Sequence, residues 1–286
     1  MNLNGVKTAA LLAGLGALFI AIGGVLGGTD GLIIGLVLGV GVCGASYWFS
    51  DTIAIKAARA RPVTEAEMPE YYAIVRDLTQ RAGMPMPRLY VTPDQQPNAF
   101  ATGRNPHHAA VAVTAGILQI CTWDELRGVL AHEISHVGNR DILIASVAAA
   151  IAMAITLLAR MAAWAGLFFG GNRENQGQNI FGLLAMLILA PLAAALLQLA
   201  LSRSREFQAD RSGARLIGDG EPLARALAKL ENGARQVPMQ GVRPEMAPLY
   251  IVSPLAGGRD QMARLFSSHP STQERIARLR SREWAR

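Results

Sequence analysis

The chain has 286 residues, of which 51% are hydrophobic and only 17% are charged, and its mean hydropathy is +0.25. This composition excludes an ordinary soluble domain and predicts a membrane protein with a soluble part. The formal net charge of +6 comes without an RNA- or DNA-binding motif, so no nucleic-acid partner is expected. Cys43 and Cys121 are too few for a disulfide framework, and we expect both to be buried thiols in a reducing compartment.

Two apolar, glycine-rich stretches open the chain, at residues 8–27 and 31–48. Each is long enough to cross a bilayer as a helix, which needs about 20 residues. The first could instead be a cleaved signal peptide, since Lys7 precedes its apolar core. Because a second span follows at once, we expect an uncleaved helical hairpin that anchors the chain in a membrane.

Two further apolar runs lie at residues 142–159 and 180–201. Arg160 follows the first run, and a charge at mid-membrane costs about 2.5–3.5 kcal/mol, so Arg160 either ends the span or faces the protein interior. Pro191 and Gln198 interrupt the second run and are tolerable where neighbouring helices satisfy them. A buried hairpin of a soluble helical bundle is the alternative; the scarcity of charges favours membrane spans.

Four spans divide the chain into alternating membrane and soluble segments. We expect an anchor hairpin over 1–49, a soluble piece over 50–141, a second membrane hairpin over 142–201 and a second soluble piece over 202–286. Basic residues beside the spans would all share one side, and the positive-inside bias places that side, with both termini, in the cytoplasm. These residues are Lys7, Lys56, Arg59, Arg61, Arg140, Arg203 and Arg205.

The first soluble piece is predicted to be α+β. Thr64 and Glu67 match a capping box, so a helix is expected from near Thr64 to near Gly83. Strands are expected at 87–91, 98–102 and 109–115, the last two as a hairpin. An exposed edge of this hairpin could hold an extended peptide by main-chain hydrogen bonds; alternatively the small sheet is purely structural.

The hairpin is followed by the pattern His-Glu-x-x-His, in which His132, Glu133 and His136 are the defining residues. On a helix, positions i and i+4 share one face, so both imidazoles can reach one metal ion while the carboxylate approaches a water molecule. A capping box at Thr122 and Glu125 predicts that such a helix begins there. The pattern therefore indicates a zinc hydrolase, whose metal needs a third protein ligand and keeps a position for water.

Glu206 and Asp210 are the candidates for completing this site, since they lie at i and i+4 on a predicted helix after the fourth span. Glu206 could bind the metal, and Asp210 could accept the free N–H of a ligand histidine. Two solvated surface carboxylates are the alternative. The second membrane hairpin would bring Glu206 to the histidines, because packed helices lie about 8–10 Å apart.

The rest of the second soluble piece is expected to hold two more helices, from Glu221 to Glu231 and from Ser271 to about Arg282. Between them we expect a loop over 232–249, either a flexible lid or a connector, and a short strand over 249–252. The whole chain is thus predicted to be a mainly α membrane protein with an α+β cytoplasmic domain and a small β-sheet beside the motif helix.

The motifs together resemble the HtpX family of bacterial membrane zinc metalloproteases, and the similarity runs from the anchor hairpin to the last helix. The segments that carry it are 97–104, 129–136 with 139–141, 202–210 and 268–276. The resemblance implies a gluzincin (zincin) fold with one zinc ion bound by His132, His136 and Glu206. It also implies that Glu133 is the general base and that Asp210 supports a ligand.

The same resemblance implies polypeptide substrates, namely misfolded or damaged membrane proteins, and stress-response quality control at the bacterial inner membrane. By similarity to related gluzincins, Asn98 and Ala99 are expected to line the substrate cleft, and His269 is expected to steady the oxyanion. From the residues alone, His269 could equally be a turn residue. Small residues in the first two spans could pack helices within one chain or between copies in a homo-oligomer.

A catalytically silent membrane scaffold, clamped by a structural zinc ion, is the competing hypothesis. A structural site would need a fourth protein ligand, whereas an intact Glu133 indicates an open coordination position. Cys121 is at the far end of the motif helix and is a poor candidate for that ligand.

Overall fold

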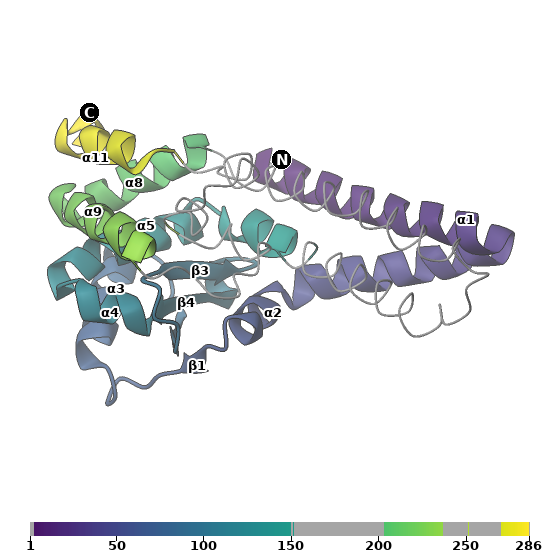
Figure 1. Cartoon of the computed structure of the whole chain (residues 1–286), viewed down its shortest axis with the longest axis horizontal. Helices are drawn as coiled ribbons and strands as arrows, with labels where there is room; N and C mark the ends of the chain where they lie inside the picture. Colours follow the sequence, from purple (N-terminus) through teal and green to yellow (C-terminus); the bar gives the residue numbers. More distant parts are fainter. Residues whose placement is uncertain (1–2, 150, 152–202, 237–250, 252–269, 286) are drawn as a thin grey trace.

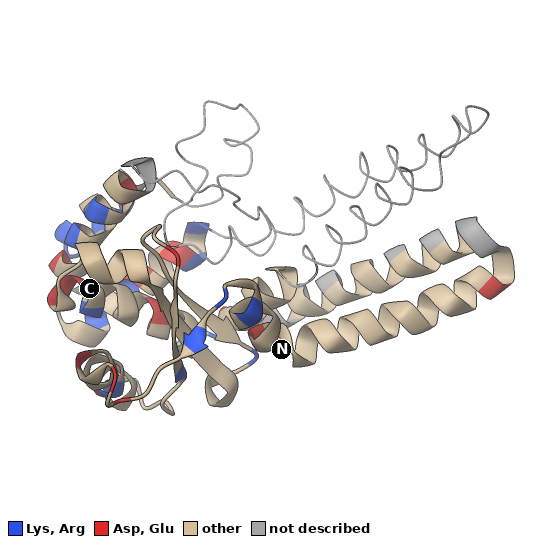
Figure 2. Cartoon of the chain, turned by 60° about the horizontal axis from the view of Figure 1, so that its bottom comes forward, with Lys and Arg blue, Asp and Glu red and all other residues tan. Residues whose placement is uncertain are grey.

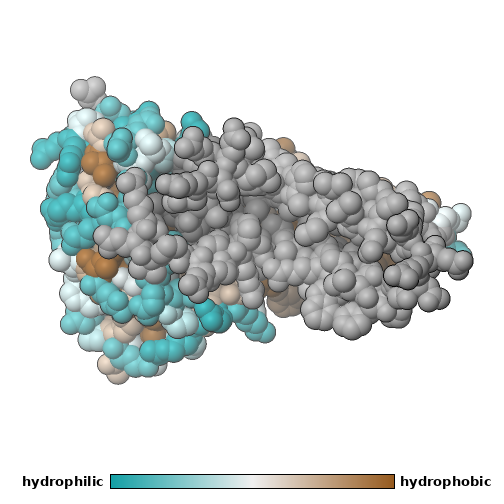
Figure 3. Space-filling model, viewed as in Figure 1, coloured by the Kyte–Doolittle hydropathy of each residue, from teal (hydrophilic) through white to brown (hydrophobic). Residues whose placement is uncertain are grey.

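The computed structural model describes residues 3–149, 151, 203–236, 251 and 270–285. A helical hairpin projects from a compact part in which helices surround a small sheet (Figure 1). The described residues of the hairpin include almost no charged ones, whereas acidic and basic residues are spread over the compact part (Figure 2). On the face shown in Figure 3 the described surface of the compact part is largely hydrophilic.

The projecting hairpin is α1, Leu3–Trp48, whose chain reverses direction at Gly28, where φ is 58°. Its arms approach closely through glycines, since a Cβ on Gly23 would lie 2.1 Å from the Gly31 carbonyl oxygen. These small residues therefore pack helices within the chain. The arm Gly28–Trp48 has 21 residues with a hydropathy of 1.8, and it is long and apolar enough to cross a membrane.

Of the four predicted spans, this arm alone meets that criterion within the described residues, and the apolar segment Thr8–Ala21 of the first arm is shorter. The predicted hairpin over 8–27 and 31–48 is present, with its turn where it was expected. Residues 142–149 are helical, but the rest of the predicted span 142–159, apart from residue 151, and all of 180–201 lie outside the described residues.

The sheet has four strands in the order β1-β2-β4-β3. Strand β2 pairs parallel with β4, while β1 and β3 pair antiparallel with β2 and β4, so β3 lies at an edge. The strands are β1 (Arg61–Pro62), β2 (Arg88–Thr92), β3 (Ala99–Gly103) and β4 (Ala109–Thr114). The predicted strands and hairpin are thus confirmed, whereas β1 was not foreseen.

Both faces of the sheet are covered, and β4 shows the alternation that this requires. Ala110 and Ala112 pack against α2 (Ser50–Ala57), which follows the membrane hairpin. Val111 and Val113 point into the main core with α3 (Pro69–Arg81) and α5 (Trp123–Gly138). Short helices η1 (Pro106–His108) and α4 (Ala115–Ile120) flank β4.

Helix α3 begins later than the predicted position near Thr64. The Glu67 carboxylate accepts from the Thr64 N–H at 2.7 Å, and Thr64 Oγ1 accepts from the Glu67 N–H at 3.4 Å, but these bonds close a turn. The helix cannot pass through Met68, which precedes Pro69 and has φ −140° and ψ 67°, because a residue before proline avoids the α region. The helix therefore begins at Pro69.

Helix α5 starts as predicted: Thr122 is its N-cap, and both hydrogen bonds of the capping box with Glu125 are present. The helix lies between the sheet and two later helices, α8 (Arg203–Ile217) and α9 (Glu221–Gln236) (Figure 1). Helix α11 (Thr272–Arg280), followed by η3 (Glu283–Ala285), packs on α8 and α9. Ser271 caps α11 as predicted.

The loop predicted over 232–249 is wrong for 232–236, because α9 continues to Gln236. Gly233 broke the apparent helical pattern, yet it lies in a close contact, since a Cβ there would lie 2.8 Å from Pro97 Cγ. Packing thus overrides helix propensity. Residues 237–249 lie outside the described part of the chain, as does the predicted strand 249–252 except for Ile251, which forms a bend.

The contact between α5 and α9 depends on Gly128, where a Cβ would lie 2.4 Å from the Leu223 backbone nitrogen. We expect Gly128→Ala to lower the free energy of unfolding by about 1–3 kcal/mol, because the helices must separate. This loss should outweigh the roughly 1 kcal/mol by which alanine favours a helix. Denaturant unfolding of the purified protein in detergent measures it.

Gly138→Ala is the matched control at the end of the same helix. The nearest atom to a Cβ there is the flexible Met84 Sδ, at 3.4 Å, so we expect no loss of stability. A Gly128→Ala protein as stable as wild type would contradict the close packing of α5 on α9.

Candidate metal centre

Two helices bring together the residues that the sequence singled out. His132, Glu133 and His136 lie on α5, and Glu206 lies on α8. The helices approach closely at Gly213 of α8, where a Cβ would lie 2.9 Å from the His132 backbone nitrogen. One donor atom from each of His132, His136 and Glu206 lies within 4.8 Å of the others, and the structure shows no other such group in its described part.

The separations in this cluster suit one metal ion. The two imidazole Nε2 atoms are 3.1 Å apart, and oxygens of Glu206 lie 3.6 Å from each of them. Donor atoms bound at about 2.0–2.1 Å to a tetrahedral ion are roughly 3.3 Å apart. His132, His136 and Glu206 can therefore hold a metal ion with little movement.

Asp210 fixes the imidazole of His132 from the side opposite the cluster. His132 Nδ1 lies 2.9 Å from Asp210 Oδ1, and Arg275 of α11 donates to both Asp210 oxygens, at 2.7 and 2.8 Å. Burial would raise the pKa of Asp210, but the Arg275 charge and the hydrogen bonds with His132 and Arg275 together outweigh burial and lower this pKa to about 2. Since an ionised carboxylate only accepts hydrogen bonds, His132 carries its proton on Nδ1.

Asp141 plays the corresponding part for His136, with Oδ2 lying 3.3 Å from Nδ1. The end of α5 makes this contact possible. Asp141 N–H donates to the His136 carbonyl at 3.0 Å and Arg140 N–H to the Val137 carbonyl at 3.2 Å, the two bonds of a Schellman motif. Arg140 takes the left-handed position of that motif, with φ 59°, so the chain turns back and Asp141 faces the histidine.

This arrangement leaves two lone pairs facing each other. With both imidazoles neutral and Nδ1 of each directed at a carboxylate, the Nε2 atoms of His132 and His136 are acceptors only 3.1 Å apart. Glu206 adds further acceptor oxygens to the same space. Such a set of acceptors is unfavourable unless a proton on His136 or a metal ion lies among them, which is the property expected of a metal site.

The charges around the cluster support the same conclusion. The arginines can offset only two of the carboxylates, and buried charge without compensation is costly. With every carboxylate ionised and both imidazoles neutral, as metal binding requires, an excess of two negative charges remains, which one divalent cation would neutralise. The buried groups are Glu133, Asp141, Glu206, Asp210, Arg205 and Arg275, none more than 8% exposed.

The pKa values reflect this excess. Burial alone would lower the pKa of His136, but the hydrogen bond with Asp141 and the charges of Glu206 and Glu133 raise it to about 9. Burial lowers the pKa of His132, and the bond to Asp210 only partly opposes this effect. Burial raises the pKa of Glu133 to about 7.

Glu133 lies between the cluster and the edge strand. Its Oε2 accepts a hydrogen bond from the Ala101 N–H of β3 at 2.9 Å. The side chain is 5% exposed, in keeping with its raised pKa. A carboxyl group beside a metal cluster with a pKa near neutrality can take up and release a proton during a reaction.

The other predicted site residues have different positions. Ala99 is the buried first residue of β3. Asn98, directly before it, accepts a hydrogen bond from the Ile251 N–H through Oδ1 at 3.0 Å. His269 lies outside the described residues. The cleft roles of Asn98 and Ala99 and the oxyanion role of His269 therefore stay predictions.

Sequence reasoning missed Asp141 and Arg275. Asp141 depends on a left-handed non-glycine residue, which no pattern signals. Arg275 had a weak signal, because it lies four residues before Leu279 and these two are the buried residues of α11. An arginine on the buried face of an amphipathic helix indicates an internal partner.

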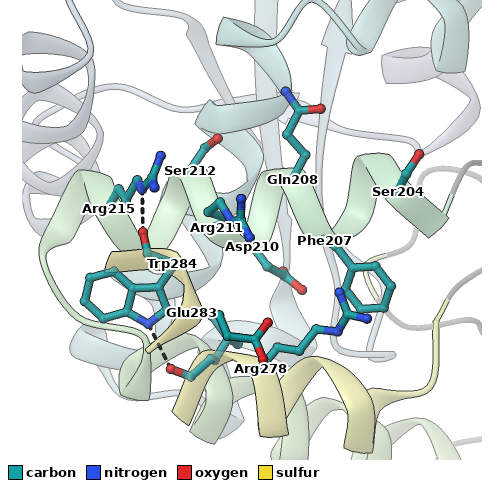
Figure 4. A pocket seen from close by; sticks show the side chains of 11 residues that line it. Ser204, Phe207, Gln208, Asp210, Arg211, Ser212, Arg215, Arg278, Glu283 and Trp284 are labelled. Carbon is teal, nitrogen blue, oxygen red and sulfur yellow. Dashed lines mark hydrogen bonds between the residues drawn. The ribbon is translucent and has the colours of Figure 1, made fainter. Parts of the chain in front are cut away.

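The outer side of α8 carries a separate cavity of about 560 Å³, shared with α11 and η3 (Figure 4). Asp210 reaches its lining, and the Arg278 guanidinium lies over the Phe207 ring, 3.8 Å from its centroid. None of the three metal-cluster residues lines this cavity. It is therefore distinct from the metal centre.

Comparison with known proteins identifies the family of this chain. The family model Peptidase family M48 matches residues 65–283. A protein described as Protease HtpX homolog from Syntrophobacter fumaroxidans (strain DSM 10017 / MPOB) is 52% identical over 278 residues, covering 96% of this chain and 98% of the relative. The chain belongs to peptidase family M48.

Other relatives extend the M48 assignment. A Protease HtpX homolog from Pelotomaculum thermopropionicum (strain DSM 13744 / JCM 10971 / SI) is 49% identical over 280 residues, covering 97% of this chain and 98% of the relative. The crystal structure of S. mikatae Ste24p shares the fold, with a TM-score of 0.51 at 20% identity. This chain is covered to 96% and spans 65% of that structure. The chain is an HtpX-family membrane metalloprotease.

Asp141 should matter for metal affinity although it does not belong to the cluster. We expect Asp141→Asn to weaken metal binding about 10- to 100-fold, because His136 loses the carboxylate that orients it and raises its basicity. Competition with a chromophoric chelator measures the affinity. Asp77→Asn is the control, since Asp77 pairs with Arg81 and Arg127 away from the cluster. Equal affinities for all three proteins would refute the role of Asp141.

Proposed function

We propose that this M48 protease is a zinc endopeptidase that hydrolyses peptide bonds of misfolded or damaged membrane proteins. We further propose that it acts at the cytoplasmic face of the bacterial inner membrane, with His132, His136 and Glu206 as zinc ligands. The observation that carries the proposal is the position of Glu133, a buried carboxyl group beside an intact group of three donor atoms.

Zinc suits this site because two imidazoles and one carboxylate are a frequent ligand set of catalytic zinc. When bound, zinc supplies a Lewis acid that polarises a carbonyl group and lowers the pKa of water to about 7. Asp210 and Asp141 hold the two imidazoles through Nδ1, which leaves the Nε2 atoms to bind the ion when it is present. The buried Arg275 donates hydrogen bonds to both oxygens of Asp210 and so holds this carboxylate in position.

Glu133 is the proposed general base. Its carboxylate takes a proton from the attacking water and passes it to the leaving amine. A pKa raised by burial to about 7 lets one group accept and then donate this proton near neutral pH. The hydrogen bond from Ala101 N–H holds the carboxylate in place between β3 and the cluster.

The outer edge of β3 is the proposed substrate-binding surface. The N–H groups of Ala101 and Gly103 point away from β4, to Glu133 and to Ser146. By the alternation of a strand, the backbone of Ala99 points the same way. A peptide added to this edge would lie beside Glu133, with Ala99 and the adjacent Asn98 lining its path. His269 is retained as the proposed oxyanion donor.

The competing scaffold hypothesis lacks a fourth ligand within the described residues, where the cluster comprises His132, His136 and Glu206 alone. Cys121 is at the opposite end of α5 from these histidines, and burial raises the pKa of its thiol to about 12, which disfavours the thiolate that a metal binds. A buried Glu133 beside the cluster also has no use in a closed structural site.

The membrane hairpin and the HtpX relatives support the proposed substrate and location. Helix α1 leads into α2 under the sheet, and a membrane-inserted α1 would hold the protease part next to a bilayer. Polypeptides that protrude from the same membrane are then the most accessible substrates. Copies of the chain could also associate through the membrane, although the α1 glycines at positions 23, 31 and 35 are already used within the hairpin.

Glu133→Gln should abolish turnover and leave the metal in place. We expect hydrolysis of an unfolded test protein to fall at least about 10²- to 10⁴-fold, since the amide cannot accept the proton. Zinc content, measured by atomic spectroscopy, should stay equal to that of wild type. Activity in the Glu133→Gln protein would disprove the role of Glu133.

Glu206→Ala is the companion variant, and it should lose both zinc and activity, because two histidines alone hold the ion weakly. Glu221→Ala serves as the control, since Glu221 pairs with Arg280 on an exposed surface. A full zinc content in Glu206→Ala would show that another residue is the third ligand.

A further inference from the structure

The end of β3 is fastened to the membrane-bound parts of the chain. Arg104, directly after β3, donates from Nη1 to the Trp48 carbonyl at 3.1 Å, and its guanidinium carbon lies 5.7 Å from the Trp48 ring centroid. The Thr102 and Ser146 hydroxyls are 2.8 Å apart, and Gly103 N–H donates to Ser146 at 3.2 Å. Strand β3 therefore ends against α1 and against the helix that contains Ser146.

Trp48 marks the level of the membrane surface. It is the last residue of the apolar arm Gly28–Trp48, and it is 59% exposed, next to Phe49 at 56%. Exposed tryptophans at the ends of apolar helices are typical of the membrane–water interface. A guanidinium over the ring suits the same level, where it can also meet lipid headgroups.

Glu133, the proposed general base, lies a short distance from the membrane surface that Trp48 marks. Ala101 marks the position of Glu133 along β3, because the Ala101 N–H contacts Glu133. Ala101 and Gly103 are two residues apart, which is roughly 7 Å along a strand. The headgroup layer on each side of the hydrocarbon core is about 5–8 Å thick. Glu133 therefore acts near the outer limit of the headgroups.

The direction of β3 determines which way a bound peptide would run relative to the membrane. The strand runs from Ala99, far from the membrane, to Gly103, next to it. β4 occupies one side, so an added peptide can pair only with the other. Antiparallel pairing is somewhat more stable per residue than parallel pairing. A peptide bound in this way runs from its N-terminal to its C-terminal end while moving away from the membrane.

We propose that the substrates of this site are segments that directly follow a membrane span, entering from the span outwards. The inference deepens the proposed protease function and rests on it. A segment tethered to the same membrane stays close to the height of the site, so its effective concentration there is high and falls as the tether lengthens. Moving the cleavable bond from about 10 to about 50 residues beyond the span should therefore lower cleavage by a factor of about two or more.

The test uses wild-type enzyme and single-span test proteins reconstituted together in liposomes. One cleavable sequence is placed about 10 or about 50 residues after the span, joined by a glycine–serine linker. In a third protein the same sequence precedes the span by about 10 residues on the same side of the membrane. We expect the near, following segment to be cleaved at least about twofold faster than the distant one, and also faster than the preceding one.

The outcomes separate the inference from the protease function. Equal cleavage of all three membrane substrates would overturn the inference and leave the protease function intact. Faster cleavage of the preceding segment would overturn the proposed polarity. If wild type cleaves neither these substrates nor a soluble unfolded protein, the proposed function itself fails.

A variant pair tests the fastening of β3. Arg104→Ala removes the contact with Trp48, so we expect a smaller ratio of near to distant cleavage while hydrolysis of a soluble unfolded protein is retained. Arg61→Ala is the matched control, because Arg61 is an exposed arginine that pairs with Glu67 at the other edge of the sheet. An unchanged ratio in Arg104→Ala would show that this contact does not set the preference.

Discussion

Two imidazole nitrogens held 3.1 Å apart, both presented as acceptors, are the constraint on which the rest of the site depends. The carboxylates of Asp210 and Asp141 contact Nδ1 of His132 and His136, so that the Nε2 atom of each ring faces the cluster. The positive charge of Arg275 compensates the negative charge of Asp210. The remaining buried carboxylates give the space between α5 and α8 an excess of negative charge, which favours the binding of a divalent cation there. Metal binding and the packing of these two helices are thus one structural problem.

Two glycines allow the helices around the metal centre to pack closely. Gly213 lets α8 approach the backbone of α5 at His132, and Gly128 lets α9 approach the same helix about one turn earlier. The membrane hairpin also positions the sheet, because α2 follows α1 in the chain and packs against β3 and β4. As a result the edge of β3 that faces away from β4 contacts Glu133, and the residue after the strand, Arg104, contacts Trp48 at the end of α1.

Much of the site could be predicted because its signals are local. A capping box at Thr122 and Glu125 and histidines four residues apart define the start and the working face of α5. The pairing of β2 with β4 was not predicted, because β3 intervenes in sequence and parallel pairing has no turn signal. Likewise, the hydrogen bonds between Thr64 and Glu67 match the start of a helix, but Pro69 prevents the helix from beginning there, so these bonds close a turn.

The supporting residues of the metal centre were harder to foresee. Asp141 requires Arg140 in a left-handed conformation, which costs a non-glycine residue roughly 1–2 kcal/mol and has no sequence signature. Arg275 meets Asp210 across 65 residues of sequence, a pairing that only the packing of α11 on α8 reveals. Such contacts depend on tertiary structure, whereas the motif helix depends on neighbours within one turn.

X-ray absorption spectroscopy at the zinc edge of the purified, zinc-loaded protein tests the central claim most directly. The account predicts two imidazole nitrogens and carboxylate or water oxygens at about 2.0–2.2 Å, without sulfur. Scattering from a sulfur ligand at about 2.3 Å, or from a single imidazole, would contradict a centre built from His132, His136 and Glu206.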